Sequence, residues 1–427
     1  MTRLLPLFFL CCLAASVQLV QAGDGGGLAA YLQTALERND EIRAARARLE
    51  AAEERIRRTG VLPDPRISVQ YYLEPIETRT GPQNSAVALS QTVPWFGKLA
   101  LRREQGEIDA IIAARQLAAV ELKVARRVKT TYVEYGLLGQ SIRIVGENLE
   151  ILRYLESIAR TRYAAGSSSF VDVLKIQIEM DRVEEQARDL NDQTVPRRID
   201  LNNLLGSAPE MARPLPDKIP VVELPVTPDE LLAALRTRSP KLAEARQVID
   251  RAEKERALAE RDFYPDLTFS LKTIFTGEAE YGAPAGSGDD PVIAGVTLNL
   301  PIFTDRRHGA VAEQSARILD ARHRREQLLR ELTSDVEQLL YRYREAQRKI
   351  ALFRDSLVPK IRQELEVALE GFQSGTYSIL ELMDAQRGLL DFELEESRAL
   401  AERAITLARL EELSGMTLAR WEGNSSP

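Results

Sequence analysis

The feature that most constrains the fold of this chain is an internal duplication. Residues 39–46 align with residues 239–246 at an offset of 200, and Gly206 aligns with Gly415 at an offset of 209. Further matches between them occur in the same order at intermediate offsets. An offset that only grows along the chain is what a duplication with short loop insertions produces. We therefore expect two copies of one structural unit.

Each copy is predicted to contain a helix, two strands, a long helix and a final helix. The six predicted helices cover residues 28–58, 99–163, 170–205, 229–262, 306–372 and 379–414. A helix over 99–163 would be about 100 Å long, at a rise of about 1.5 Å per residue. An ordinary globular domain is not that wide. The two shorter helices of each copy together match this length, so we expect them to lie end to end, antiparallel to the long helix.

Apolar residues along both long helices recur alternately every four and three residues, which is the spacing of coiled-coil packing. In the first copy this seam includes Val128, Tyr135 and Leu149, and a second apolar stripe includes Ile144 and Ile151. A helix with two such stripes packs against two neighbours, as in a ring of helices.

The remaining segments divide the chain into regions. Residues 207–226 contain five prolines, which no continuous helix tolerates, so they are predicted to form a linker. This linker separates the first repeat at 23–206 from the second at 227–415. Residues 416–427 are predicted to be a flexible tail.

The first 22 residues have the pattern of a secretory signal peptide. An apolar run from Leu4 to Val20 follows a single basic residue, and Ala22 supplies a small residue at the cleavage position. Cys11 and Cys12 are the only cysteines and lie inside this segment, so no disulfide or thiolate chemistry is expected in the mature chain. A lipid-modified N-terminus is the alternative, although neither cysteine follows a small residue.

Composition and residue spacing argue against several classes of function. The chain has 64 acidic and 57 basic residues, and nucleic-acid binding would need a basic face. His308 and His323 are fifteen residues apart beside arginines, so we interpret them as surface residues rather than metal ligands. Asp289 and Asp290 lack the ligand spacing of a calcium loop. We predict no enzyme activity, no metal site and no cofactor.

Four short segments break the helical pattern and alternate apolar with polar residues, as strands do. They cover residues 66–73, 85–93, 267–272 and 292–300. No later apolar run is long enough for a membrane helix, and such strands can span an outer membrane. Four strands cannot close a barrel, which needs at least eight, but three copies of the chain would supply twelve. A small soluble sheet packed on a helix bundle is the alternative.

Prolines mark the four points where strands and helices meet. Pro63 matches Pro265 at an offset of 202, and Pro94 matches Pro301 at an offset of 207. Aromatic residues lie beside these prolines, and aromatic girdles are typical of membrane interfaces. The residues expected to form such a girdle are Trp95, Phe96, Phe263, Tyr264 and Phe303.

Taken together, these motifs resemble the TolC-like outer-membrane efflux proteins. The resemblance covers essentially the whole mature chain, and is carried by the duplication and by residues 35–46, 62–65, 91–98 and 204–206. It implies a mainly α-helical fold with a membrane β-barrel: a homotrimer with twelve strands on a twelve-helix α-barrel. It also implies docking to a periplasmic adaptor protein and to an inner-membrane pump of the resistance-nodulation-division type. The 94–98 stretch looks most like the heavy-metal efflux branch.

The second helical hairpin tip is the candidate gate. Glu381 and Asp384 are three residues apart, so both carboxylates project from one face of a helix. They match acidic positions that line the periplasmic entrance in the family, and three copies would form two rings that favour cations. Tyr377 stands where some members carry a basic residue that helps to lock the closed state. A solvated helix face is the alternative.

The two tips are also the expected contacts for the adaptor, through residues Gly166, Ser167, Asp172, Gly375, Thr376 and Tyr377. The sequence thus predicts an outer-membrane channel subunit that extends into the periplasm and acts as a passive conduit for metal ions or small toxic compounds. An outer-membrane component of a protein secretion system and a periplasmic structural coiled-coil protein are the two alternatives.

Overall fold

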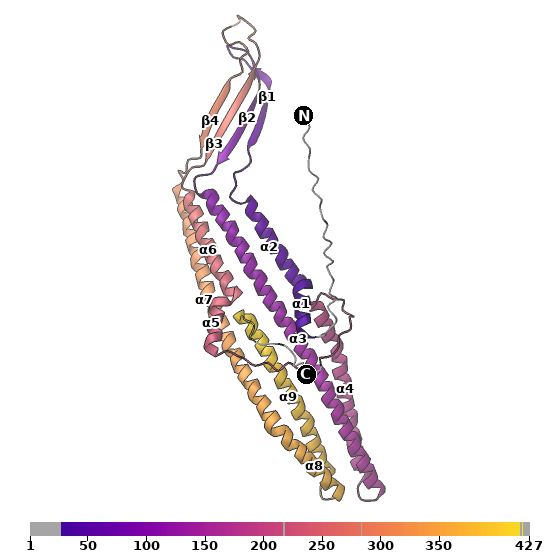
Figure 1. Cartoon of the computed structure of the whole chain (residues 1–427). Coiled ribbons are helices and arrows are strands. Elements are labelled where there is room, and N and C mark those ends of the chain that lie inside the picture. The colour runs from indigo at the N-terminus through magenta and orange to yellow at the C-terminus, as the bar shows by residue number, and fades with distance from the viewer. Residues whose placement is uncertain (1–26, 217, 283, 419–420, 422–427) are drawn as a thin grey trace, which may run out of the picture.

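Four strands form one sheet at the end of a long bundle of helices (Figure 1). The structure is a computed structural model, and it describes residues 27–216, 218–282, 284–418 and 421. The predicted signal peptide at 1–22 lies outside the described residues. Among the described residues, no helix combines the length and the apolar character needed to cross a membrane.

The elements follow the predicted order twice. The first repeat comprises α1 (Leu28–Arg38), α2 (Asp40–Arg58), β1 (Arg66–Ile76), β2 (Gln83–Val93), α3 (Lys98–Ala164) and α4 (Phe170–Leu204). The second comprises α5 (Pro228–Arg238), α6 (Pro240–Arg261), β3 (Leu267–Thr276), β4 (Val292–Leu298), α7 (Thr304–Leu352), the π-helical turn η1 (Phe353–Leu357), α8 (Val358–Ser374) and α9 (Ile379–Ser414).

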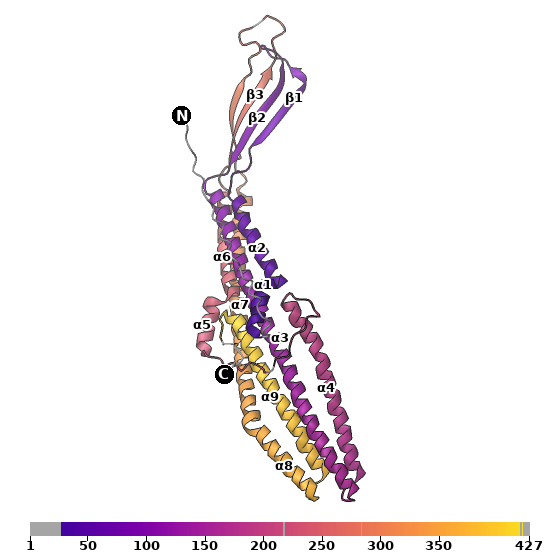
Figure 2. The ribbon, with the colours of Figure 1, turned by 45° about the vertical axis from the view of Figure 1, so that its right-hand side comes forward.

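The long helix α3 holds the first repeat together. Helix α2 packs along the half of α3 nearer the sheet, and α4 packs along the other half (Figures 1 and 2). In the second repeat, α6 and α9 pack in the same way along the row formed by α7, η1 and α8. The predicted end-to-end arrangement of the short helices is confirmed.

The helix predicted over 28–58 is wrong in one respect, because it is broken at Asn39. The Asn39 side chain accepts hydrogen bonds from the backbone N–H groups of Glu41, at 3.0 Å, and Ile42, at 3.3 Å, and so caps α2. Its amide nitrogen donates to the carbonyl oxygen of Leu204 at 2.9 Å, at the end of α4. An asparagine that satisfies two helix ends at once favours a break over a continuous helix.

The second repeat has the same joint, built from different residues. The helix predicted over 229–262 is likewise broken, at Ser239, because Pro240 has no N–H to continue the helix. In both repeats a glycine with positive φ ends the last helix: Gly206 at +61° and Gly415 at +67°. A Cβ at either glycine would lie under 3 Å from a backbone carbonyl oxygen of the facing helix end.

The long helix predicted over 306–372 is interrupted by the π-helical turn η1. Pro359 is the second residue after this turn. A proline inside a helix removes a hydrogen bond and collides with the carbonyl oxygen four residues earlier, and a π-helical turn accommodates both effects. The row of helices therefore continues, but as α7 and α8 rather than as one regular helix.

The predicted apolar seams form the core between the helices. Val128 and Val145 of α3 and Val336 of α7 are fully buried. One apolar cluster lies around the joints and contains both α1 and α5, and a second lies between the hairpins farther from the sheet. Continuous packing of this kind along two stripes is what lets so long a helix form.

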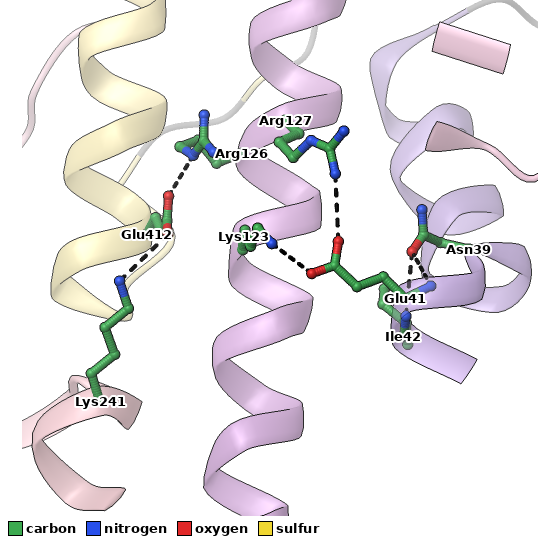
Figure 3. A network of polar contacts seen from close by, with 8 residues as sticks. All are labelled: Asn39, Glu41, Ile42, Lys123, Arg126, Arg127, Lys241 and Glu412. Atoms are coloured by element: carbon green, nitrogen blue, oxygen red, sulfur yellow. Dashed lines mark hydrogen bonds and ion pairs between the residues drawn. The ribbon is translucent and has the colours of Figure 1, made fainter. Parts of the chain in front are cut away.

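Ion pairs on both sides of α3 tie it to its neighbours near the joints (Figure 3). Glu41 of α2 accepts from Lys123 at 2.6 Å and pairs with Arg127 at 3.4 Å. On the other side, Arg126 pairs with Glu412 of α9. Charged side chains of α3 thus hold it between α2 of its own repeat and α9 of the other repeat.

The tail predicted to be flexible from residue 416 is packed where it is described. Leu418 and Trp421 are buried. Glu411 accepts from the Leu418 N–H at 2.8 Å, from the Trp421 indole at 3.0 Å and from Lys129 of α3 at 2.5 Å. The prediction fails here because a buried carboxylate needs donors, and the tail supplies two of them.

All four strands belong to one antiparallel sheet with the order β1-β2-β3-β4. The middle pairing joins the two repeats, with Leu89 of β2 opposite Leu271 of β3. On one face of β1 the side chains of Ile67, Val69 and Tyr71 are each more than 70% exposed. This face is apolar, and none of the described residues covers it.

We predict that both joints depend on their glycines. Gly206→Ala and Gly415→Ala should each lower the free energy of unfolding by about 2 kcal/mol or more, since a Cβ adds left-handed strain and a clash with backbone. Gly146→Ala in α3 is the control, because a Cβ there meets nothing within 4 Å in the chain. That change should raise stability by about 0.5–1 kcal/mol. Thermal unfolding in detergent measures all three, and equal effects would contradict the role of the joints.

Candidate functional site: the hairpin tips and the strand–helix junction

The two helical hairpins end side by side, at the pole opposite the sheet (Figure 1). Gly166 and Gly375 have positive φ and end the helices that reach each tip. At each tip a serine precedes the next helix, and its backbone N–H donates to a carboxylate three residues later. At the first tip, the Ser169 N–H donates to Asp172 at 3.3 Å.

At the second tip, Glu381 has the equivalent capping role. Its carboxylate accepts from the Ser378 N–H at 2.7 Å and from the Ser378 hydroxyl at 3.1 Å. Asp384 lies one turn farther along α9, and both carboxylates belong to exposed residues. One of the two predicted gate residues is thus partly engaged in holding its own helix end.

The two carboxylates predicted to form the gate share a groove with basic residues that sequence reasoning missed. A groove of about 490 Å³ separates α4 from α9, and its lining includes Lys175, Ile178, Leu380, Glu381, Asp384 and Arg387. The duplication offers the signal that could have found Lys175, because an offset of 209 aligns it with Asp384. The site therefore carries charges of both signs.

Arg387 is held by a partner from the other repeat. Its guanidinium donates to the buried Glu179 of α4 at 2.5 Å. The hydrogen bond and charge of Glu179, helped by Asp384, raise the pKa of Arg387 above its usual value. This ion pair joins α9 to α4 one turn beyond Glu381 and Asp384.

Arg162 of α3 connects the two tips. It donates to the carbonyl oxygen of Ser167 at 3.0 Å and lies 4.9 Å from the ring of Phe372 in α8. Tyr377 packs on Gly371, where a Cβ would lie 2.6 Å from its ring. The Thr376 N–H also donates to the Gly371 carbonyl oxygen, at 2.8 Å. A basic residue is therefore present at the tips, but on α3 rather than at position 377.

The predicted aromatic girdle is brought together only in part. Trp95 stacks on Tyr264 with ring centres 5.3 Å apart and meets Phe96 edge-on at 5.7 Å. Phe263 instead contacts His308 of α7, at 5.0 Å. Phe303 is 74% exposed. The aromatic residues lie at one end of the sheet, but only three of the five form one cluster.

Lys98 links the two repeats at this end of the sheet. Its buried ammonium group lies 2.9 Å from Asp266 and 3.1 Å from Asp262. Burial of Asp266 opposes ionisation, but hydrogen bonds from the Trp95 N–H and from Lys98 outweigh it and lower the pKa of Asp266. The motif at 94–98 therefore joins the two repeats through an ion pair. The sequence of one repeat alone could not predict this role, because both aspartates belong to the other repeat.

No group of three or more histidine, cysteine or acidic side chains suited to a metal ion occurs within the part of the chain that the structure describes.

Comparison with known proteins gives consistent matches over the whole architecture. The profile of the family described as "Outer membrane efflux protein" matches residues 31–207 and 231–416. The two matched segments correspond to the two repeats.

Two relatives and one solved structure are representative. The cobalt-zinc-cadmium resistance protein CzcC of Cupriavidus metallidurans is 26% identical, over 85% of this chain and 83% of its own length. The outer membrane protein TolC of Vibrio cholerae is 23% identical over 97% of this chain and 96% of its own. The outer membrane protein VceC of Vibrio cholerae shares the fold with a TM-score of 0.75 at 19% identity, covering 91% of this chain and 96% of that one.

Long helices that carry a four-stranded sheet at one end define a class of outer-membrane channel proteins whose helices extend into the periplasm. The chain belongs to the outer membrane efflux protein family. It is a transport protein and not an enzyme, and the alternative of a periplasmic structural coiled coil is removed.

The capping bond at the second tip yields a local prediction. Glu381→Ala should speed hydrogen exchange of the amides in the first turn of α9 about fivefold, since a lost cap costs about 1 kcal/mol. Glu381→Gln keeps an acceptor and should leave exchange near wild type. Asp384→Ala is the control on the same helix face. Exchange that rises equally in Asp384→Ala would contradict the assignment of the cap to Glu381.

Proposed function

We propose that three copies of this chain form a passive channel through which a tripartite pump exports its cargo. The observation that carries this proposal is the sheet, whose outer strands β1 and β4 each pair on one side only in the part of the chain that the structure describes. Exposed strand edges and an uncovered apolar face need a partner, and a closed barrel removes both. Three sheets of four strands make a barrel of twelve.

The hairpin tips are the proposed docking site for a periplasmic adaptor. Gly166 and Ser167 at the first tip and Gly375 and Thr376 at the second are small residues at the far pole of the molecule. Small side chains let another helix approach closely. The inner-membrane partner in this proposal is a pump of the resistance-nodulation-division type, which the adaptor would join to the channel.

Divalent metal ions are the cargo that we favour. The support is the similarity to CzcC, whose name ties it to cobalt, zinc and cadmium resistance, over most of both chains. Small toxic compounds and secreted proteins are the other candidate cargoes.

Deleting the gene in its host should lower tolerance to Co²⁺, Zn²⁺ and Cd²⁺ several-fold, because the pump would lose its outlet, and growth on metal gradients measures this. Supplying the intact gene should restore tolerance, which controls for effects on neighbouring genes. Unchanged metal tolerance with new sensitivity to organic toxic compounds, or with loss of a secreted protein, would contradict metal export.

Glu381 and Asp384 are the proposed gate at the periplasmic entrance. Two carboxylates and Lys175 leave a net charge of −1 per chain in the groove, because Arg387 and Glu179 neutralise each other. Three chains would place about −3 around the axis. A ring of this sign concentrates cations, and salt screens the effect.

The double variant Glu381→Gln/Asp384→Asn should invert this selectivity. It keeps the helix cap but changes the net charge of the groove from −1 to +1 per chain. The ratio of K⁺ to Cl⁻ permeability, measured in planar bilayers at low salt, should fall from above one to below one, and block by multivalent cations should disappear.

A matched control removes the same charge at the same spacing elsewhere. Glu147→Gln/Glu150→Gln lies on the exposed part of α3, about 25 Å from the first tip at about 1.5 Å per residue. This variant should leave the permeability ratio close to wild type. If the gate variant behaves like this control, Glu381 and Asp384 only solvate a helix face.

A further inference from the structure

The two outer strands of the sheet leave their outer edges without a partner among the described residues. Most residues of β1 and of β4 are exposed. If the channel is a trimer, as proposed above, β4 of each subunit lies beside β1 of the next. The internal duplication then determines which residues face each other across that seam.

The duplication reproduces strand register inside the chain. The offset of 202 carries β1 onto β3, and the offset of 207 carries β2 onto β4. Val69 lies opposite Val87, so these offsets require Leu271 opposite Ala294, which is the pairing in the structure. Every β1–β2 pair from Arg66↔Ser90 to Tyr71↔Ser85 transfers onto β3–β4 in this way, whereas the Ile76↔Gln83 pair beyond the bulge in β1 has no counterpart.

The same offsets relate the β2–β3 pairing between the repeats to the pairing of β4 with β1 between subunits. In the chain, Leu89 of β2 lies opposite Leu271 of β3. The offset of 207 leads from Leu89 to Val296 of β4. The offset of 202 leads back from Leu271 to position 69 of β1. The pair therefore becomes Val296 of one subunit and Val69 of the partner subunit. We infer that β4 pairs with β1 of the partner subunit in this register, in which the residue numbers of facing residues always add to 365.

The apolar face of the sheet supports this register independently. Val69, Leu89, Leu271 and Ala294 lie on one face across the four strands. The inferred register places Val296 on the same face as Val69 of the partner subunit, so the apolar face continues around the seam. A slip of one residue would place polar side chains on this face, which a buried or lipid-facing surface does not tolerate.

A contact on the opposite face distinguishes this register from a slip of two residues. Lys272 donates to Gln70 at 3.3 Å, across the small side chain of Ala88. These two residues are equivalent in the repeats, at an offset of 202. Across the seam, the inferred register places Gln70 of the partner subunit opposite Gly295, within reach of Lys272. A slip of two residues would move that amide by about 7 Å along the strand.

Cysteine cross-linking tests the register directly. Both natural cysteines lie in the predicted signal peptide, so introduced cysteines would be the only ones in the mature chain. The variant Val69→Cys/Val296→Cys places its cysteines opposite each other, within the distance of about 7 Å that a disulfide needs. Oxidation should link it into covalent trimers on a non-reducing gel.

Two slipped variants and one internal pair complete the experiment. Ile67→Cys/Val296→Cys and Tyr71→Cys/Val296→Cys keep the same face but are displaced by two residues, and should cross-link poorly. Leu89→Cys/Leu271→Cys is the internal equivalent of the tested pair, so its disulfide should form within one chain.

The results separate the register from the trimer itself. Light scattering on the reduced protein gives the number of chains in the particle. If the particle is a trimer but a slipped pair cross-links better than the in-register pair, the inferred register is wrong. The proposed trimeric channel is not contradicted by that result. A trimer in which only the internal pair forms a disulfide shows that β4 and β1 are not neighbours, which also overturns the inference. A particle of one chain defeats the proposed channel as well.

Discussion

The end-to-end contact between short helices is the constraint on which the rest of the structure depends. A helix of 67 residues is stable only if neighbours cover its apolar stripes along its whole length. The fold meets that need with two helices that abut, and each joint requires a glycine against the facing backbone, Gly206 in one repeat and Gly415 in the other. The joints place the sheet at one pole of the molecule and the hairpin tips at the other, which is the separation that a channel across two compartments needs.

The two repeats are equivalent in shape but not in charge. Within the chain, a buried lysine clasps the repeats together: Lys98 with Asp262 and Asp266. At the offsets of 207 and 202, the counterparts of Lys98 and Asp266 are Asp305 and Asp64, so the proposed seam between subunits would not repeat this ion pair. In the proposed trimer, strand pairing and the apolar face would therefore carry the association between subunits without this ionic contact. In the proposed trimer, a ring of six similar units would therefore have two kinds of seam, one within each chain and one between chains.

Periodicity and duplication predicted the order, length and pairing of the helices, because apolar spacing over tens of residues has few physical interpretations. They did not predict the breaks at Asn39 and Ser239, because the apolar pattern runs through both positions, although Asn39 and Pro240 are themselves local signals of a helix start. Lys175 and Arg387 were missed because their importance comes from a groove between repeats. The packing of Trp421 was missed for a related reason: its partner Glu411 is buried and also accepts from Lys129 of the other repeat. Sequence reasoning thus worked where neighbours are close in the chain or repeat a pattern, and failed where single side chains from distant segments meet.

The central claim is that one chain is a third of a closed channel. Electron microscopy of the purified particle in detergent, viewed along its long axis, tests this most directly. The account predicts a ring with threefold symmetry, in which six similar units alternate in two slightly different forms. A single open arch, or a ring of any other symmetry, would contradict it.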